Sequence, residues 1–214
     1  MRWQGKVYLT CLILFLYFPI LFLMVYSFNS ANNMIEFKGF TLEHYASLFS
    51  NTRLMSVILN TVSVALLAAA IATIIGTFGA IGVYHLRQRK IKTTITALNN
   101  VLMVSSDVVI GASFLIMFIA IGQITGFGLG FTTVLISHIA FCIPIVFILV
   151  LPQLYDMNHN ILNAARDLGA TESQVLSKVL LPQLTPAIIG GFFMALTYSC
   201  LLYTSDAADE EDSE

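Results

Sequence analysis

The sequence predicts an all-α integral membrane protein, a polytopic bundle of transmembrane helices, from its composition, its apolar runs and the clustering of its charges. Of the 214 residues, 57% are hydrophobic and 10% are charged, and the mean hydropathy is +0.85. Soluble proteins average about 25% charged residues. This composition excludes an ordinary soluble domain, and we expect contact with membrane lipid and no nucleic-acid partner.

Five apolar runs are each long enough to span a bilayer. A helix rises ~1.5 Å per residue and needs ~20 apolar residues to cross ~30 Å of hydrocarbon. The runs are too long and continuous for barrel strands, and the first exceeds the ~7–15 apolar residues of a signal peptide. We therefore expect one membrane domain over residues 1–203, with spans at 7–28, 55–84, 98–121, 131–151 and 184–203.

The three cysteines, Cys11, Cys142 and Cys200, all fall inside these apolar runs. They show neither a paired spacing nor a nearby cluster of metal ligands, so disulfide and zinc interpretations both fail. We expect ordinary packing at each cysteine, and no metal or cofactor.

The distribution of positive charge predicts the topology. Lys and Arg concentrate on the cytoplasmic side of membrane proteins. Eight of the ten agree with a cytoplasmic N-terminus and a cytoplasmic loop at about 152–183; they are Arg2, Lys6, Arg87, Arg89, Lys90, Lys92, Arg166 and Lys178.

The second span carries a ladder of small residues at every fourth position, Ala68, Ala72, Gly76 and Ala80. Small side chains let a second helix approach closely in lipid. The partner helix could come from the same chain or from another subunit, and the sequence leaves both open.

Three polar residues are candidates for lining a route through the membrane. Asp107 is the only carboxylate inside a predicted span, and a charge near the midplane costs on the order of 3 kcal/mol unless it meets water or a polar partner. It could attract a cation with Ser106 beside it, or be a protonated acid bonded to Ser105 or Ser106, or lie at a misplaced span boundary. His138 in the fourth span could line the route or bond a backbone carbonyl of a neighbouring helix.

The loop at 152–183 reads as two short helices joined at a glycine. Residues 161–168 carry an apolar side, and Gly169 is placed to end that helix in a left-handed cap. Thr171 and Gln174 form a capping box for a second helix, which we expect Pro182 to halt. The apolar stripe must pack on the spans or on a soluble partner.

The stretch "NAARDLGA", followed by "LLP" and "PAI", resembles the loop by which inner-membrane permeases of binding-protein-dependent ABC importers dock on their ATPase subunits. That family's loop begins Glu-Ala-Ala, continues to a fixed Gly and ends in Leu-Pro. Asn163 stands where the family usually has Glu, which puts a specific polar contact there in doubt. The resemblance assigns ATPase coupling to Asn163, Ala164, Ala165, Arg166, Asp167, Leu168, Gly169, Leu181 and Pro182.

Three further stretches, "GFTLEHYASLF", "SSDVVIGASFLIMF" and "SHIAFCIPIV", resemble the permeases of spermidine/putrescine importers. The resemblance implies a bacterial inner-membrane transport subunit for polyamines, with separate ATPase subunits, a second permease and an extracytoplasmic substrate-binding protein. The sequence contains no phosphate-binding glycine loop, so ATP hydrolysis is expected in a partner, and no catalytic residue is assigned. Alternatives are an importer of another small solute and a non-transporting scaffold; an intramembrane aspartyl protease lacks its second carboxylate.

The end of the chain departs from the family, whose members continue to a sixth span. Here "CLLYTSDAADEEDSE" (200–214) replaces that continuation, and six of the twelve acidic residues lie in the last nine positions. We expect a C-terminal truncation, with a disordered or non-native tail over 204–214. A genuine solvated tail is the alternative.

Overall fold

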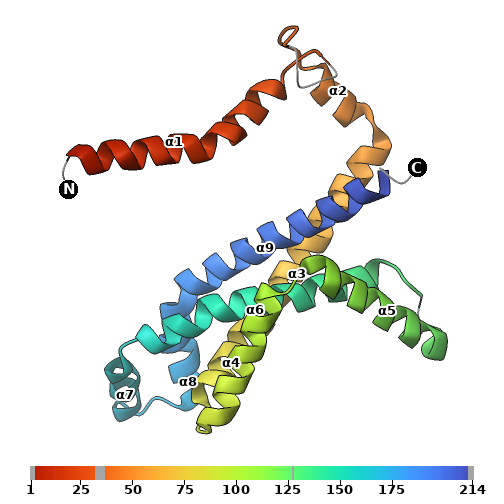
Figure 1. Ribbon diagram of the computed structural model, residues 1–214. Coiled ribbons are helices and arrows are strands. Elements are labelled where there is room, and N and C mark those ends of the chain that lie inside the picture. Colours follow the sequence, from red (N-terminus) through yellow and green to blue (C-terminus); the bar gives the residue numbers. More distant parts are fainter. Residues whose placement is uncertain (1–2, 32–36, 127, 212–214) are drawn as a thin grey trace. The chain divides into compact units, whose positions relative to one another are not determined.

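The chain is built from helices in the parts that the structure describes, residues 3–31, 37–126 and 128–211 (Figure 1). Within these described residues of the computed structural model, five helices are long and apolar enough to cross a membrane. The all-α class is therefore confirmed, although several span ends differ from the predicted ones. The five helices cover Gly5–Tyr26, Thr52–His85, Asp107–Thr125, Phe131–Asp156 and Glu172–Leu202.

Residues 1–58 form a compact unit with helices α1 (Trp3–Tyr26) and α2 (Glu43–Ser50). The link between them is organised by Asn29, which is 2% exposed. Its side-chain oxygen accepts the backbone N–H of Lys38 at 2.9 Å, and its carbonyl oxygen lies 2.9 Å from Nε2 of His44. These contacts fold the link back on itself. Arg2, one of the charges behind the expected topology, lies outside the described residues.

Helix α3 (Thr52–His85) confirms that the ladder of small residues is a packing surface within the chain. Ala68, Ala72 and Ala80 are fully buried, and Gly76 is buried among them. A Cβ atom on Gly76 would lie only 2.8 Å from Cβ of Val146, which belongs to helix α6 (Phe131–Asp156). Because only glycine permits this approach, the intrachain alternative for the ladder is the one that the structure adopts.

Residues 59–214 form the second compact unit, and helix α6 (Phe131–Asp156) runs through its core. Helix α9 (Leu181–Glu211) packs along α6 (Figure 1). A Cβ on Gly191 of α9 would lie 3.3 Å from Cγ1 of Val146. Val146 is therefore held between a glycine of α3 and a glycine of α9, and this close packing centres the unit on α6.

The third apolar run is divided, which differs from the single span expected at 98–121. Helix α4 (Arg89–Val104) ends where Ser105 and Ser106 adopt extended backbone, and helix α5 (Asp107–Thr125) begins immediately after them. Serine competes for backbone hydrogen bonds and favours helix caps, and an acidic residue suits a helix N-terminus. These preferences account for the break at Ser105 and Ser106 inside an apolar run.

Helix α9 also continues further than expected. Its backbone stays helical to Glu211, although the sequence predicted a disordered tail from residue 204. The stretch 204–211 contains no Gly or Pro to end the helix, and Ala and Glu are good helix formers. The last three positions, 212–214, lie outside the described residues.

Candidate functional site

The first candidate site is the helical loop, residues 157–180, which joins α6 to α9. Its first helix, α7 (His159–Asp167), begins at Asn158, whose side chain accepts the backbone N–H of Asn160 at 3.0 Å. Leu162 is buried in the same hydrophobic core as Leu154 and Met157 of the preceding segment. The apolar side of α7 thus packs on the protein's own helices, one of the two possibilities left open by the sequence.

Gly169 ends α7 in the left-handed cap that the sequence predicted, with φ +83°. The N–H of Gly169 donates to the carbonyl of Arg166 at 2.9 Å, and the N–H of Ala170 donates to the carbonyl of Ala165 at 3.1 Å. This pair of bonds is a Schellman motif, which satisfies carbonyls that the helix end leaves unpaired. A β-carbon is disfavoured at this φ, so the turn depends on glycine.

The second helix of the loop, α8 (Glu172–Val175), opens with the predicted capping box. The N–H of Thr171 donates to Oε1 of Gln174 at 3.0 Å, and the N–H of Gln174 donates to Oγ1 of Thr171 at 3.4 Å. The reciprocal pair fixes where the second helix begins. Only one residue, Ala170, separates this box from Gly169, so the turn between the two helices is tightly specified.

The expectation that Pro182 halts the second helix is wrong. A π-helical turn, η1 (Leu176–Leu180), connects α8 directly to α9, and the N–H of Leu181 bonds the carbonyl of Leu176. Pro182 then occupies the first turn of α9. A proline lacks an N–H and disrupts an α-helix interior, but it is tolerated in a first turn. The change to i→i+5 bonding at η1 begins a new α-helical register just before the proline.

A salt bridge joins Arg166, before the turn at Gly169, to Glu172, after it. Arg166 donates from Nε to Oε1 of Glu172 at 2.8 Å and from a terminal nitrogen to Oε2 at 3.0 Å. The hydrogen bond to Glu172 raises the pKa of the Arg166 guanidinium above its usual value. Arg166 also donates to Oδ1 of Asn163 at 3.4 Å. Asn163 therefore takes part in the polar network of the turn.

The outer face of the helical loop is hollowed and partly apolar. Leu168 is 89% exposed at the end of α7. Beside it lies a shallow open groove, lined by Ala165, Leu168, Gly169, Ala170, Gln174, Lys178 and Val179. An exposed leucine in a groove with a lysine at its rim offers a protein partner both an apolar contact and a charge.

The second candidate site surrounds Asp107, which is the first residue of α5 and not part of a helix interior. The Tyr198 hydroxyl of α9 donates a hydrogen bond to Oδ1 of Asp107. Ser106 precedes it in extended backbone and is exposed. Of the options that the sequence left open, a boundary at this residue is the one the structure adopts, and the polar partner is a tyrosine distant in sequence.

His138 of α6 contacts α9 through a hydrogen-bonding partner of its own, different from that of Asp107. It is 3% exposed, and its Nδ1 lies 2.7 Å from Oγ of Ser199. One partner of His138 is therefore a side-chain hydroxyl of α9, whereas the sequence had suggested either a backbone carbonyl of a neighbouring helix or a place along the route. Tyr198 and Ser199 are consecutive on α9, so their side chains leave the helix in different directions, about 100° apart. Sequence analysis missed both partners.

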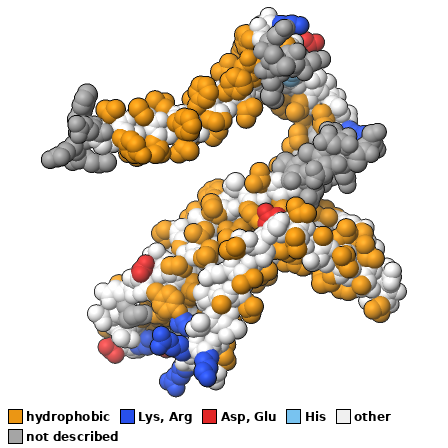
Figure 2. Space-filling view, viewed as in Figure 1, with side chains coloured by type: hydrophobic (Ala, Val, Ile, Leu, Met, Phe, Trp, Pro, Cys, Tyr) orange, Lys and Arg blue, Asp and Glu red, His pale blue; other side chains and the backbone are white. Residues whose placement is uncertain are grey.

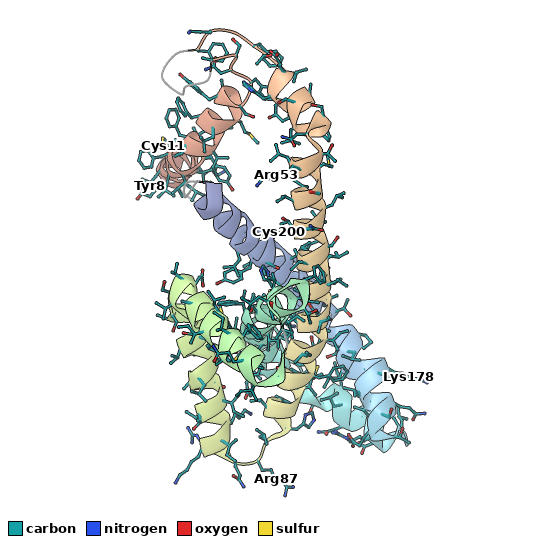
Figure 3. The ribbon with its side chains drawn as sticks, turned by 90° about the vertical axis from the view of Figure 1, so that its right-hand side faces the viewer. Tyr8, Cys11, Arg53, Arg87, Lys178 and Cys200 are labelled. Carbon is teal, nitrogen blue, oxygen red and sulfur yellow. The ribbon has the colours of Figure 1, made fainter. Side chains whose placement is uncertain are left out.

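Positive charge gathers at one end of the second unit. Figure 2 shows the Lys and Arg side chains clustered there, and Figure 3 shows Arg87 and Lys178 at this same end. Arg87 follows α3 and Lys178 belongs to η1. The helical loop and the α3–α4 link therefore share one end of the bundle.

These features define a class: a polytopic helical membrane protein with a polar helical loop at the positively charged end of its bundle. Residues 72–205 match the family model described as the binding-protein-dependent transport system inner membrane component. The chain belongs to this family. It is accordingly a membrane subunit of a transport system.

The relatives carry more specific names. The chain is 36% identical over 192 residues to the spermidine/putrescine transport system permease protein PotC of Escherichia coli K12, covering 90% of this chain and 71% of the relative. It is 35% identical over 185 residues to PotC of Haemophilus influenzae, covering 86% of this chain and 70% of the relative. The putrescine transport system permease protein PotI of Escherichia coli K12 is 32% identical over 187 residues, 86% of this chain and 66% of PotI.

Proposed function

We propose that the chain is a permease subunit of an ABC importer for polyamines in a bacterial inner membrane. The names of its relatives concern spermidine and putrescine, and three of them are at least 32% identical to it. A polyamine carries several positive charges, which a route through the bilayer must offset. The permease domain in this proposal covers residues 1–203, and its partners are a second permease subunit and an extracytoplasmic substrate-binding protein.

The observation that carries the mechanism is the geometry of the helical loop. Its turn is fixed by the Schellman motif at Gly169 and by the capping box at Thr171, and the exposed salt bridge between Arg166 and Glu172 adds little to it. Its inner side packs into the core, while Leu168 stays exposed. A rigid element with one packed side and one free side can pass a movement from a bound ATPase into the bundle.

The orientation follows from charge. Because the helical loop lies at the end where Arg87 and Lys178 gather, the positive-inside rule makes this end cytoplasmic. The chain then enters the membrane with a cytoplasmic N-terminus. Separate ATPase subunits on the cytoplasmic side can reach the loop and supply the energy for alternating access.

Asp107 is the proposed contact for the solute. It is exposed at the break between α4 and α5, and its carboxylate accepts the Tyr198 hydroxyl. A carboxylate at a helix break can face an aqueous route, because irregular backbone at membrane depth is tolerated where it lines a cavity. An ammonium group of a polyamine would meet Asp107 with Ser106 beside it. His138 is less suited to direct contact with the solute, since it is buried against α9.

The test is uptake of labelled spermidine and putrescine by cells that lack their own polyamine importers and express this chain with its partner subunits. We expect ATP-dependent uptake that Asp107→Asn weakens about tenfold, because the substitution keeps the shape and removes the charge. Ser113→Ala, on an exposed position of the same helix, is the matched control. Uptake of an unrelated solute instead of polyamines would refute the assignment of the solute, and equal uptake by both variants would remove Asp107 from the route.

A further inference from the structure

Lys92 differs from the other cations of the link between α3 and α4. Arg87, Arg89 and Lys90 are exposed, whereas Lys92 is half-buried. Its Nζ lies 4.5 Å from the ring centroid of Tyr155 and 5.6 Å from that of Tyr84. Both distances fall within the ~6 Å at which a cation is attracted to an aromatic face.

The same ammonium also holds the end of α3. Nζ of Lys92 donates to the carbonyl oxygen of Tyr84 at 3.3 Å. This carbonyl belongs to the last turn of α3, where carbonyls have no partner within the helix and where positive charge is favourable. The rings of Tyr84 and Tyr155 meet edge to face, with centroids 5.6 Å apart. We call Lys92, Tyr84 and Tyr155 the lysine clamp; it joins α4, α3 and α6.

The lysine clamp adjoins the core that holds the helical loop. Val83 and Leu154, the chain neighbours of the two tyrosines, belong to one hydrophobic core with Leu162 of α7 and Val175 of α8. Tyr84 itself packs against that core. A shift of the loop therefore reaches the tyrosines through contiguous packed side chains, which deform little and transmit displacement.

Helix α4 leads from the clamp to the break before Asp107. It has 16 residues, about 24 Å at ~1.5 Å per residue. Further along, Nδ2 of Asn99 donates to the carbonyl of Pro144 on α6 at 3.3 Å. Because α4 is held at its first turn and again near its middle, we expect it to move as a rigid body. A displacement at Lys92 then reaches Ser105 and Ser106 at its other end.

We propose that Lys92 is a positioning residue for transport: through the lysine clamp it makes α4 follow the helical loop, so that ATPase movement reaches the break beside Asp107. The inference rests on the proposed function of the loop. Loss of the clamp leaves the loop free to dock and move, while α4 no longer follows it. ATP hydrolysis then continues without proportionate transport.

The test uses the whole complex of both permease subunits, the ATPase and the binding protein, reconstituted in liposomes. The measured quantities are the polyamine transported per ATP hydrolysed and the amount of ATPase that co-purifies. We expect Lys92→Gln to lower the transport per ATP about tenfold, because it removes the cation–π contacts with Tyr155 and Tyr84. The amount of ATPase that co-purifies should be unchanged. Lys92→Arg, which keeps the cation over the rings, restores most of the coupling. Lys90→Gln, an exposed lysine two residues earlier, is the matched control.

The aromatic side of the clamp gives a second comparison. Tyr155→Phe keeps the ring beneath the ammonium and is expected to transport like the unaltered protein, whereas Tyr155→Leu is expected to uncouple like Lys92→Gln. Equal transport per ATP in Lys92→Gln and Lys90→Gln would overturn the inference while leaving the function of the loop intact. Loss of co-purification in Lys92→Gln would also overturn it, because the clamp would then serve docking. An unaltered complex that binds no ATPase would refute the proposed function itself.

Discussion

Substitution of Gly76 by alanine tests the close approach of α3 to α6. The new Cβ would lie 2.8 Å from Cβ of Val146, 3.0 Å from its Cγ1 and 3.2 Å from the carbonyl oxygen of Ile143. Carbon atoms prefer separations of about 3.5–4.0 Å, so the two helices must part by roughly 1 Å. Neither a β-carbon nor a backbone carbonyl can swing aside. Overpacking of this kind costs typically 1–3 kcal/mol.

Gly79→Ala provides the matched control on the same helix. A Cβ on Gly79 meets nothing within 4 Å, so this variant gains the same helix propensity without the clash. The difference between the two variants therefore isolates the clash. The assay is thermal unfolding of the purified chain in detergent, followed by circular dichroism at one scan rate because membrane proteins often unfold irreversibly.

We expect Gly76→Ala to unfold roughly 2–12 °C below Gly79→Ala, from a difference of about 1–3 kcal/mol in a chain of this size. Equal midpoints for the two variants would refute the close contact between Gly76 and Val146. A lower unfolding midpoint for Gly79→Ala would show that the face of α3 that carries Gly79, and not the face that carries Gly76, packs against α6.

Three further predictions concern the two candidate sites. Gly169→Pro should abolish co-purification with the ATPase while membrane insertion continues, because proline cannot adopt φ +83° and removes the N–H that bonds Arg166; normal co-purification would show that the turn is not the docking element. Glu172→Gln should leave co-purification and thermal midpoint unchanged, since the bridge to Arg166 is exposed and such pairs contribute little; loss of docking would assign the carboxylate a direct contact. Tyr198→Phe should reduce polyamine uptake a few-fold, less than Asp107→Asn, because it removes one hydrogen bond to the carboxylate and keeps the charge; unchanged uptake kinetics would separate Tyr198 from the route.

Local sequence signals predicted the helical loop well. A left-handed cap needs glycine, and a capping box needs Thr and Gln three residues apart, so Gly169 and Thr171 marked the turn without any knowledge of packing. The ladder on α3 was equally readable, because close helix approach in lipid requires small residues at regular spacing. Both features can be recognised from the spacing of residues close together along the chain.

Two predicted helix boundaries were wrong, because the backbone around them departs from the simple rule used to predict them. Pro182 was expected to end a helix, but the π-helical turn before it places the proline in a first turn. The apolar run at 98–121 was read as one span because hydropathy averages over the two serines that break it. Both errors concern where a helix begins, which a window of average composition does not resolve.

The partners of the polar residues could not be predicted because they are distant in sequence. Tyr198 lies 91 residues from Asp107, and Ser199 lies 61 residues from His138. The packing of α9 along α6 brings these hydroxyls to their partners. A run of three polar residues in an otherwise apolar stretch, Thr197, Tyr198 and Ser199, was the signal that the sequence offered.

The most direct test of the account is cross-linking from Leu168 to the ATPase subunit. Leu168→Cys is made in a variant whose native cysteines, Cys11, Cys142 and Cys200, are replaced, with Leu129→Cys as an exposed control in the link between α5 and α6. The account predicts that Leu168→Cys cross-links to the ATPase in membranes of cells expressing the whole importer. The yield of the cross-link should change when nucleotide is bound. The cysteine should also be protected from an impermeant thiol reagent added outside the cells. Labelling of Leu168→Cys from outside, or cross-linking from Leu129→Cys instead, would contradict it.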